Sequence, residues 1–203
     1  ERASLHTLLR DIRCDQHLLS VVAARSYAHE NGFAKLVLCQ SGGLKLRLHV
    51  WQPGLSARAQ ENIHDHRWHF ASHIICGEIR NDIFELGGNH SGESAESCLA
   101  YQYARPAAGL GYQLRDLGYQ ILGRTQTRRF AAGVSYALDR SVFHRIVHEY
   151  EGLTATLVLT GVPESPDCHL FARAPQPTVG ADRERTLTPD QVGDLFDHVL
   201  EAA

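Results

Sequence analysis

Two histidines separated by one residue are the strongest sign of chemistry in this sequence. His64 and His66 stand in the segment Ile63-His64-Asp65-His66. In a β-strand, alternate side chains share one face and lie about 7 Å apart along the chain, so both imidazoles can turn toward one ion. Each ring nitrogen would bind at about 2.1 Å if the metal were zinc. The spacing therefore predicts a metal site on one strand face, with Asp65 facing away and capping or salt-bridging.

A third ligand must come from a distant part of the chain, and His144 is the best candidate. It stands among apolar neighbours in Val142-Phe143-His144-Arg145-Ile146. A buried imidazole without a partner is costly, and a metal ion would satisfy it. His69 and His73 are reserve ligands. His73 lies an odd number of residues after His64, so it would face the other side of the strand unless a β-bulge intervenes. The alternative is that these are unrelated surface or core histidines.

Composition and charge narrow the classes of protein to which the chain can belong. Its 203 residues suffice for one domain with a hydrophobic core. The net charge of −3 gives no excess of basic residues that would favour binding to nucleic acid or to an anionic membrane. No apolar run is long enough to cross a bilayer, and the opening residues lack the apolar core of a signal peptide. The five cysteines are odd in number and scattered, which favours reduced thiols. We therefore expect a cytoplasmic protein.

The chain is expected to open with two helices. Leu5, Leu8, Leu9 and Ile12 recur at helical spacing. A second helix is expected to begin at Asp15, a good N-cap residue, and to end at Asn31-Gly32. Its buried face would carry Leu18, Leu19, Val22, Ala23 and Tyr27.

From residue 33 onward the sequence is typical of short strands separated by turns. One stretch alternates strictly, with Leu44, Leu46, Leu48 and Val50 on one face and Lys45, Arg47 and His49 on the other, which predicts a half-buried strand. Turn residues such as Pro53-Gly54 and Gly77 interrupt the pattern. Strands are expected at residues 33–39, 44–50, 68–76, 78–86, 97–104, 112–117, 128–138, 143–148, 155–160 and 168–173. Many short strands of this kind predict a sandwich or a closed barrel.

A third helix is expected near the C-terminus. Ala174-Pro175-Gln176-Pro177 resembles a linker, and Thr188, Pro189 and Gln191 then match a capping box with proline in the first turn. The apolar stripe that follows should pack on the barrel rather than on a partner subunit. We expect one domain over residues 1–203, with a helical segment at 1–32, a β-barrel at 33–173, and a linker and helix at 174–203.

The arrangement of His-x-His, a turn glycine and a distant histidine resembles the two-motif pattern of the cupin superfamily. This resemblance implies an all-β-dominated fold, a cupin jelly-roll barrel with two N-terminal helices and one C-terminal helix. The usual carboxylate ligand of the first motif is absent, and Phe70 stands at about its position. A three-histidine site without the acid is similar to the thiol dioxygenases of the cysteine dioxygenase family.

The similarity to that family extends beyond the ligands. In residues 136–146, Tyr136, His144 and Arg145 have the same relative spacing as in its second metal segment, and residues 163–171 resemble its Pro-rich turn and Cys-His-x-Phe strand. The resemblance implies that Tyr136 and Arg145 act in catalysis and substrate binding. Lys35 stands where the family has the arginine that binds the substrate carboxylate. A lysine keeps the positive charge but cannot donate the pair of parallel hydrogen bonds that a guanidinium gives to a carboxylate.

Other positions depart from that family. Its late-strand histidine and tyrosine are replaced by Leu159 and Gly161, and its crosslinking cysteine by Phe70 or Ala71. We therefore expect that the metal site is retained while the substrate differs from cysteine.

The histidine pattern predicts a metal site, and the resemblance implies that the metal is iron and that the protein is a dioxygenase acting on a small metabolite, for which a thiol is one candidate. Three histidines leave about half of an octahedral Fe(II) shell open for O₂ and a chelating substrate. Lys35, Tyr136 and Arg145 are the candidates for substrate binding, and Arg47 is a further candidate, although a solvated strand charge explains Arg47 more readily. His49 is expected to be an ordinary strand residue. The alternatives are a zinc, nickel or manganese cupin with isomerase or hydrolase activity, and a non-catalytic small-ligand-binding protein. As partners we expect the small substrate and O₂, but neither nucleic acid nor membrane, in a monomer or homodimer.

Overall fold

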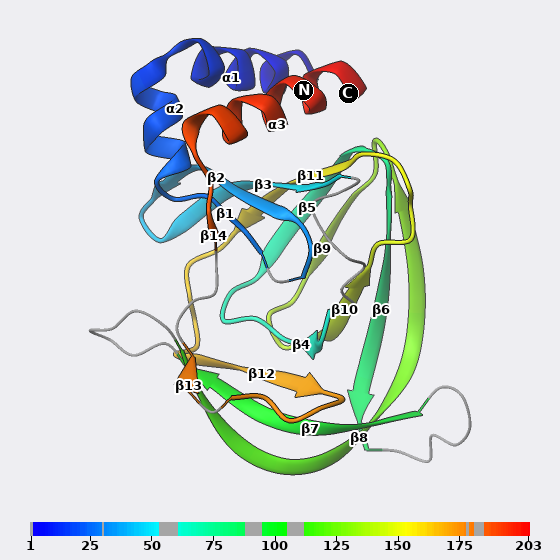
Figure 1. The fold of residues 1–203 in the computed structure, drawn as a ribbon. Coiled ribbons are helices and arrows are strands. Elements are labelled where there is room, and N and C mark those ends of the chain that lie inside the picture. The colour runs from blue at the N-terminus through cyan, green and yellow to red at the C-terminus, as the bar shows by residue number, and fades with distance from the viewer. Residues whose placement is uncertain are drawn as a thin grey trace.

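Strands make up most of the molecule, with helices at its two chain ends (Figure 1). The computed structural model describes residues 2–29, 31–52, 61–87, 95–104, 112–177, 179–180 and 185–203. The helices are α1 (Arg2–Cys14), α2 (Gln16–Ala23) and α3 (Pro189–Ala202). The strands are β1 (Tyr27–Ala28), β2 (Ala34–Ser41), β3 (Leu44–Trp51), β4 (Ile63–His64), β5 (Phe70–Cys76), β6 (Glu78–Leu86), β7 (Ala95–Ala104), β8 (Tyr112–Ala131), β9 (Ser135–Leu138), β10 (Phe143–Val147), β11 (Thr154–Thr160), β12 (Asp167–Ala172), β13 (Val179–Gly180) and β14 (Arg185–Thr186).

The strands form two seven-stranded sheets. The first has the order β14-β1-β2-β3-β11-β5-β9, and the second has the order β13-β8-β6-β10-β4-β12-β7. The long, curved β8 closes the second sheet, because its first half pairs with β7 and its second half pairs with β6. This architecture confirms the predicted jelly-roll barrel with two N-terminal helices and one C-terminal helix.

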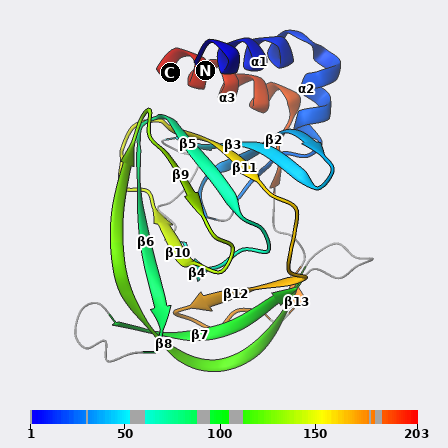
Figure 2. The same cartoon turned by 180° about the vertical axis from the view of Figure 1, so that it is seen from behind.

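The three helices lie together over the outer face of the first sheet, as both views show (Figures 1 and 2). Leu48 and Val50 of β3 share one apolar cluster with Phe196 and Val199 of α3. The C-terminal helix therefore packs on the barrel, as expected. Its capping box is also confirmed, since Thr188 accepts from the Gln191 N–H and the Gln191 side chain accepts from the Thr188 N–H.

The second helix is shorter than predicted. Asp15 caps it by accepting from the N–H groups of His17 and Leu18, but the helix ends at Ala23 rather than at residues 31–32. Tyr27 belongs to β1, where it pairs with Lys35 of β2 and Thr186 of β14. Strand pairing with distant segments thus replaces the last turns of the expected helix, and Leu18 is exposed rather than buried.

Between residues 112 and 138 the strand boundaries differ from the sequence prediction. The expected strand at 128–138 is split by a turn at Gly133, which has a φ of +85°. The expected strand at 112–117 instead continues to Ala131. Gly77 is confirmed as the turn residue between β5 and β6, with a φ of +73°, while the predicted break at Pro53-Gly54 lies outside the described residues. No helix among those described has the length and apolar character needed to cross a membrane.

Candidate metal centre

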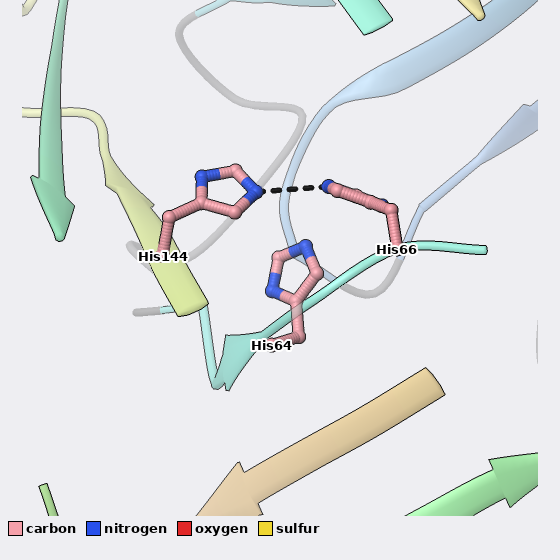
Figure 3. Close-up of side chains that lie close together, drawn as sticks. All are labelled: His64, His66 and His144. Atoms are coloured by element: carbon pink, nitrogen blue, oxygen red, sulfur yellow. Dashed lines mark hydrogen bonds between the residues drawn. The ribbon is translucent and has the colours of Figure 1, made fainter. Parts of the chain in front are cut away.

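The three predicted histidines come together where β4 pairs with β10. His64 ends β4 and stands directly opposite His144 of β10 in their antiparallel pairing. His66 follows two residues after His64, and its N–H donates to the carbonyl oxygen of Arg140 at 2.9 Å. Figure 3 shows the three rings turned toward one another. The structure thus brings together the three predicted residues, although β4 ends at His64 and His66 lies beyond the strand on which both were expected.

The distances among the rings suit one metal ion. Ring centroids are 4.8 Å apart for His64 and His66, 4.8 Å for His64 and His144, and 5.0 Å for His66 and His144. One ligand nitrogen from each residue lies within 4.8 Å of the others. The Nε2 atoms of His66 and His144 are 2.8 Å apart, close to the ~3.0 Å between two neighbouring ligands that each bind an ion at about 2.1 Å.

Hydrogen bonds to the other ring nitrogens orient two of the histidines. His64 Nδ1 donates to the carbonyl oxygen of Asn62 at 2.9 Å. His144 Nδ1 lies 3.1 Å from Oδ1 of Asn81, a residue that is 2% exposed. Histidines that ligate metals commonly donate their second N–H to an oxygen in this way, which turns the Nε2 lone pair toward the ion. The residues present therefore fit a bound metal.

The surroundings keep the rings of His66 and His144 neutral by lowering their pKa values. Burial, together with the charge of His64, holds the pKa of His144 well below its usual range. Burial also lowers the pKa of His66, with smaller contributions from His64, His144, Lys35 and Arg47. A metal binds the neutral imidazole, so both rings are in the ligating form at neutral pH.

No carboxylate joins the triad within the part of the chain that the structure describes. Phe70 packs beside it, with its ring centroid 5.0 Å from that of His66 and 5.8 Å from that of His144. An apolar ring thus lies against the ligands at the position where the resemblance would place an acid.

The reserve ligands lie elsewhere. His69 is exposed and pairs with Asp139 and Glu164, and His73 bonds to the Ser135 hydroxyl at 2.8 Å. Asp65 accepts from the backbone N–H and the ring of His169. The expected pairing of Asp65 is therefore confirmed.

A cavity of about 470 Å³ opens beside the triad and holds most of the other candidates. Lys35, Tyr136 and Arg47 all line it together with His64, His66 and His144. Tyr136 stacks on Phe130 at a centroid distance of 4.3 Å, and burial raises the pKa of its hydroxyl above the usual value. Tyr136 is therefore a neutral hydrogen-bonding group in this site.

Arg145 does not line this cavity. Its guanidinium makes two hydrogen bonds to Glu96, at 2.8 and 3.1 Å, and Asp82 lies 3.7 Å away. Adjacent residues of a strand point to opposite faces, so Arg145 must face away from the triad when His144 faces it. The expected substrate role of Arg145 is corrected to a buried ion pair within the barrel wall.

The interpretation of Arg47 as a solvated strand charge is also wrong. The alternation in β3 was read correctly, but the apolar face packs under the helices and the polar face looks into the cavity. His49, interpreted as an ordinary strand residue, lines the same wall.

Two further residues of the site, Glu61 and Asn81, were not singled out from the sequence. Glu61 is buried in the cavity wall and accepts from the Ile146 N–H at 3.0 Å, and burial raises its pKa. Asn81 is the partner of His144. Neither stands in a local pattern that could have revealed its role.

Comparisons with known proteins find similarity at the level of structure. No protein-family model matches the chain, and no curated protein sequence matches it. An RmlC-like cupin from Shewanella frigidimarina aligns with a TM-score of 0.39 and 13% identity, over 69% of this chain and 85% of that one. Oxalate oxidase in complex with glycolate aligns with a TM-score of 0.38 and 17% identity, over 68% of this chain and 55% of that one.

A third similar structure is a variant of oxalate decarboxylase from Bacillus subtilis. It aligns with a TM-score of 0.40 and 12% identity, over 72% of this chain but only 30% of that one. This chain thus spans about half of the oxalate oxidase chain and less than a third of the decarboxylase chain. At this level of similarity the alignments carry no argument about activity.

Proposed function

We propose that this chain is a non-haem iron dioxygenase that acts on a small metabolite, with a thiol among the candidate substrates. The observation that carries the proposal is the triad of His64, His66 and His144 at the wall of a cavity of about 470 Å³. A cavity of this size suits a small molecule. Iron(II) held by three neutral histidines supplies redox chemistry with O₂ and keeps coordination positions open for a chelating substrate.

The residues of the chain have separate tasks in this proposal. Lys35 lies in the cavity wall and offers a positive charge to the substrate. Tyr136 stays protonated and can donate a hydrogen bond into the cavity. Phe70, which packs against His66 and His144, excludes water from the ligands.

For a thiol the overall reaction is balanced without another reductant. A thiolate, RS⁻, and one O₂ give a sulfinate, RSO₂⁻, so that both oxygen atoms enter the product and the sulfur is oxidised by four electrons. Uptake of one O₂ per thiol consumed is therefore the expected stoichiometry.

The first experiment compares metal binding in two histidine variants. Elemental analysis of the purified protein is expected to find about one iron per chain. His144→Ala should lose nearly all of it, because two remaining ligands hold iron weakly. His73→Ala is the matched control, since this histidine lies in the same barrel but outside the triad, and it should keep its iron. Equal metal content in both variants would overturn the site.

The second experiment measures O₂ uptake by the iron-loaded protein with a panel of small thiols and other chelating acids. Uptake that disappears in His144→Ala but not in His73→Ala supports the proposal. Zinc in place of iron, or no uptake with any compound, would favour the alternatives of a cupin hydrolase or isomerase and a ligand-binding protein.

A further inference from the structure

One side of the cavity has a floor made by β12, β7 and the first half of β8, which lie side by side (Figures 1 and 2). β12 pairs with β4, so that Leu170 stands directly opposite His64. Tyr103 of β7 stands opposite Cys168 of β12 and Leu114 of β8. Residues directly opposite each other share a face of the sheet, and so do residues two positions apart in one strand. The floor therefore continues the sheet face that carries His64.

This floor is apolar and aromatic. The cavity-lining residues of these three strands are Tyr103, Tyr112, Leu114, Cys168, His169 and Leu170. Tyr103 and Tyr112 pack against the buried Leu114, and their rings stack with centroids 5.5 Å apart and planes inclined by 25°. None of these lining residues is a lysine, an arginine or an acid, and His169 is bonded to Asp65. The floor therefore suits an uncharged, flat group.

The two stacked tyrosines lie well away from the metal ligands. Tyr103 is two strands from His64 across the sheet and two residues farther along it, as the pairing through Leu170 and Cys168 shows. With strands about 4.8 Å apart and about 3.3 Å per residue, the backbones of His64 and Tyr103 are about 12 Å apart. A ligand must therefore extend well beyond its metal-binding atoms to reach these rings.

The size of the cavity also indicates a longer ligand. Its volume of about 470 Å³ equals that of about 15 water molecules in the liquid. A mercapto acid with a chain of three carbon atoms would fill roughly half of this space. A ligand that also covers the apolar floor removes more apolar surface from water and binds more tightly for that reason.

We propose that the substrate has two parts: a chelating head at the metal held by His64, His66 and His144, and an aromatic tail that lies on Tyr103 and Tyr112. This inference rests on the metal site of the proposed function and deepens that function by naming a substrate class. Tyr103 and Tyr112 are then specificity residues, because they contact the tail of the substrate and not its reacting atoms.

The test uses hydroxamates, which chelate a metal through two oxygen atoms whatever the natural substrate is. Iron-loaded protein is titrated under argon with acetohydroxamate, which is the head alone, with benzohydroxamate, whose ring stays beside the metal, and with 4-phenylbutanohydroxamate, whose ring follows a flexible spacer. Calorimetry gives the dissociation constants. We expect 4-phenylbutanohydroxamate to bind at least about tenfold more tightly than acetohydroxamate, because its tail leaves water for the apolar floor.

Three tyrosine variants locate the tail of the long probe. Tyr103→Ala should weaken 4-phenylbutanohydroxamate about tenfold and leave the two shorter probes within about twofold, because only the long probe reaches this ring. Tyr103→Phe keeps the ring and should bind all three probes like the unmodified protein. Tyr119→Ala is the matched control, since Tyr119 lies on β8, is 74% exposed and is outside the cavity lining. It should leave every affinity unchanged.

The outcomes separate this inference from the proposed function. Iron content and acetohydroxamate affinity should be the same in Tyr103→Ala and Tyr119→Ala, which checks the fold and the triad. If the long probe binds no more tightly than acetohydroxamate, or if both alanine variants weaken it equally, the inference is overturned. A protein that prefers the long probe through Tyr103 but consumes no O₂ would overturn the dioxygenase proposal alone. A protein that holds no metal would overturn both, because the head would have no anchor.

Discussion

At the residue scale, the orientation of each imidazole matters as much as its presence. Asn81 is almost fully buried in β6, and its side-chain oxygen lies 3.1 Å from Nδ1 of His144. This contact holds the ring so that Nε2 meets Nε2 of His66 at 2.8 Å. A side chain that never touches the metal can thus set the affinity of the site.

We expect Asn81→Leu to lower the affinity for iron(II) or zinc(II) by about 10- to 100-fold, because His144 would lose its orienting acceptor. Asn81→Asp keeps an acceptor oxygen and should bind metal like the unmodified protein. Competition with a chromogenic chelator measures both dissociation constants. Equal affinity of the leucine variant and the unmodified protein would show that Asn81 has no orienting role.

At the element scale, a few backbone positions decide how the strands meet. Gly77 joins β5 to β6 with a φ of +73°, and a Cβ there would lie 2.2 Å from Thr154 Oγ1 and 2.7 Å from the Leu153 carbonyl oxygen. Gly118 in β8 has a similar φ of +80°, but a Cβ there would meet nothing within 4 Å. The first glycine is therefore required by conformation and by space, and the second by conformation alone.

This difference predicts unequal costs for two alanine substitutions. Gly118→Ala should lower the free energy of unfolding by about 1–2 kcal/mol, which is the cost of the left-handed conformation. Gly77→Ala should cost at least about 1 kcal/mol more, because backbone and side chain must also move. Urea unfolding of the two variants gives the comparison. A smaller loss for Gly77→Ala than for Gly118→Ala would contradict the close approach of β11.

At the scale of the whole molecule, a partly buried ion-pair cluster joins three strands of the second sheet. Glu96 of β7 accepts hydrogen bonds from Arg145 of β10 and from Arg173 just beyond β12. Burial would raise the pKa of Glu96, but the hydrogen bonds and charges of the two arginines outweigh it and lower the pKa from its usual 4.5. Because the folded-state pKa is depressed, Glu96 stabilises the protein above about pH 4.5.

That contribution is expected to disappear as pH falls from about 4.5 through the lower folded-state pKa of Glu96. Glu96→Gln should therefore unfold at lower urea concentration at pH 7 and show a shallower loss of stability on acidification. Glu61→Gln should have the opposite effect on the urea midpoint at pH 7, because burial raises the pKa of Glu61 and makes its ionised form unfavourable at that pH. Urea midpoints between pH 7 and about pH 3 test both, and parallel curves for all three proteins over that range would contradict these assignments.

The sequence by itself determined the features that depend on local spacing. The alternation in β3 follows from the period of a strand, and the caps at Asp15 and Thr188 follow from the residue type at the helix start. The His-x-His pair identified two ligands, although only His64 lies in a strand. The barrel with its three helices, and the joining of the three histidines, followed from these patterns and from the cupin resemblance. Strand alternation places Arg145 on the face opposite to that of His144, where it pairs with Glu96.

The tertiary structure alone decided which strand faces look inward and which distant groups meet. The pleat of a strand separates its side chains into two sets, but elements far away in the chain decide which set is covered by helices and which lines a cavity. Arg47 therefore became a cavity residue, Arg145 found Glu96, and Asn81 and Glu61 took places beside the triad. The second helix ended early for the same reason, because pairing of Tyr27 with Lys35 and Thr186 outweighed its local helical pattern.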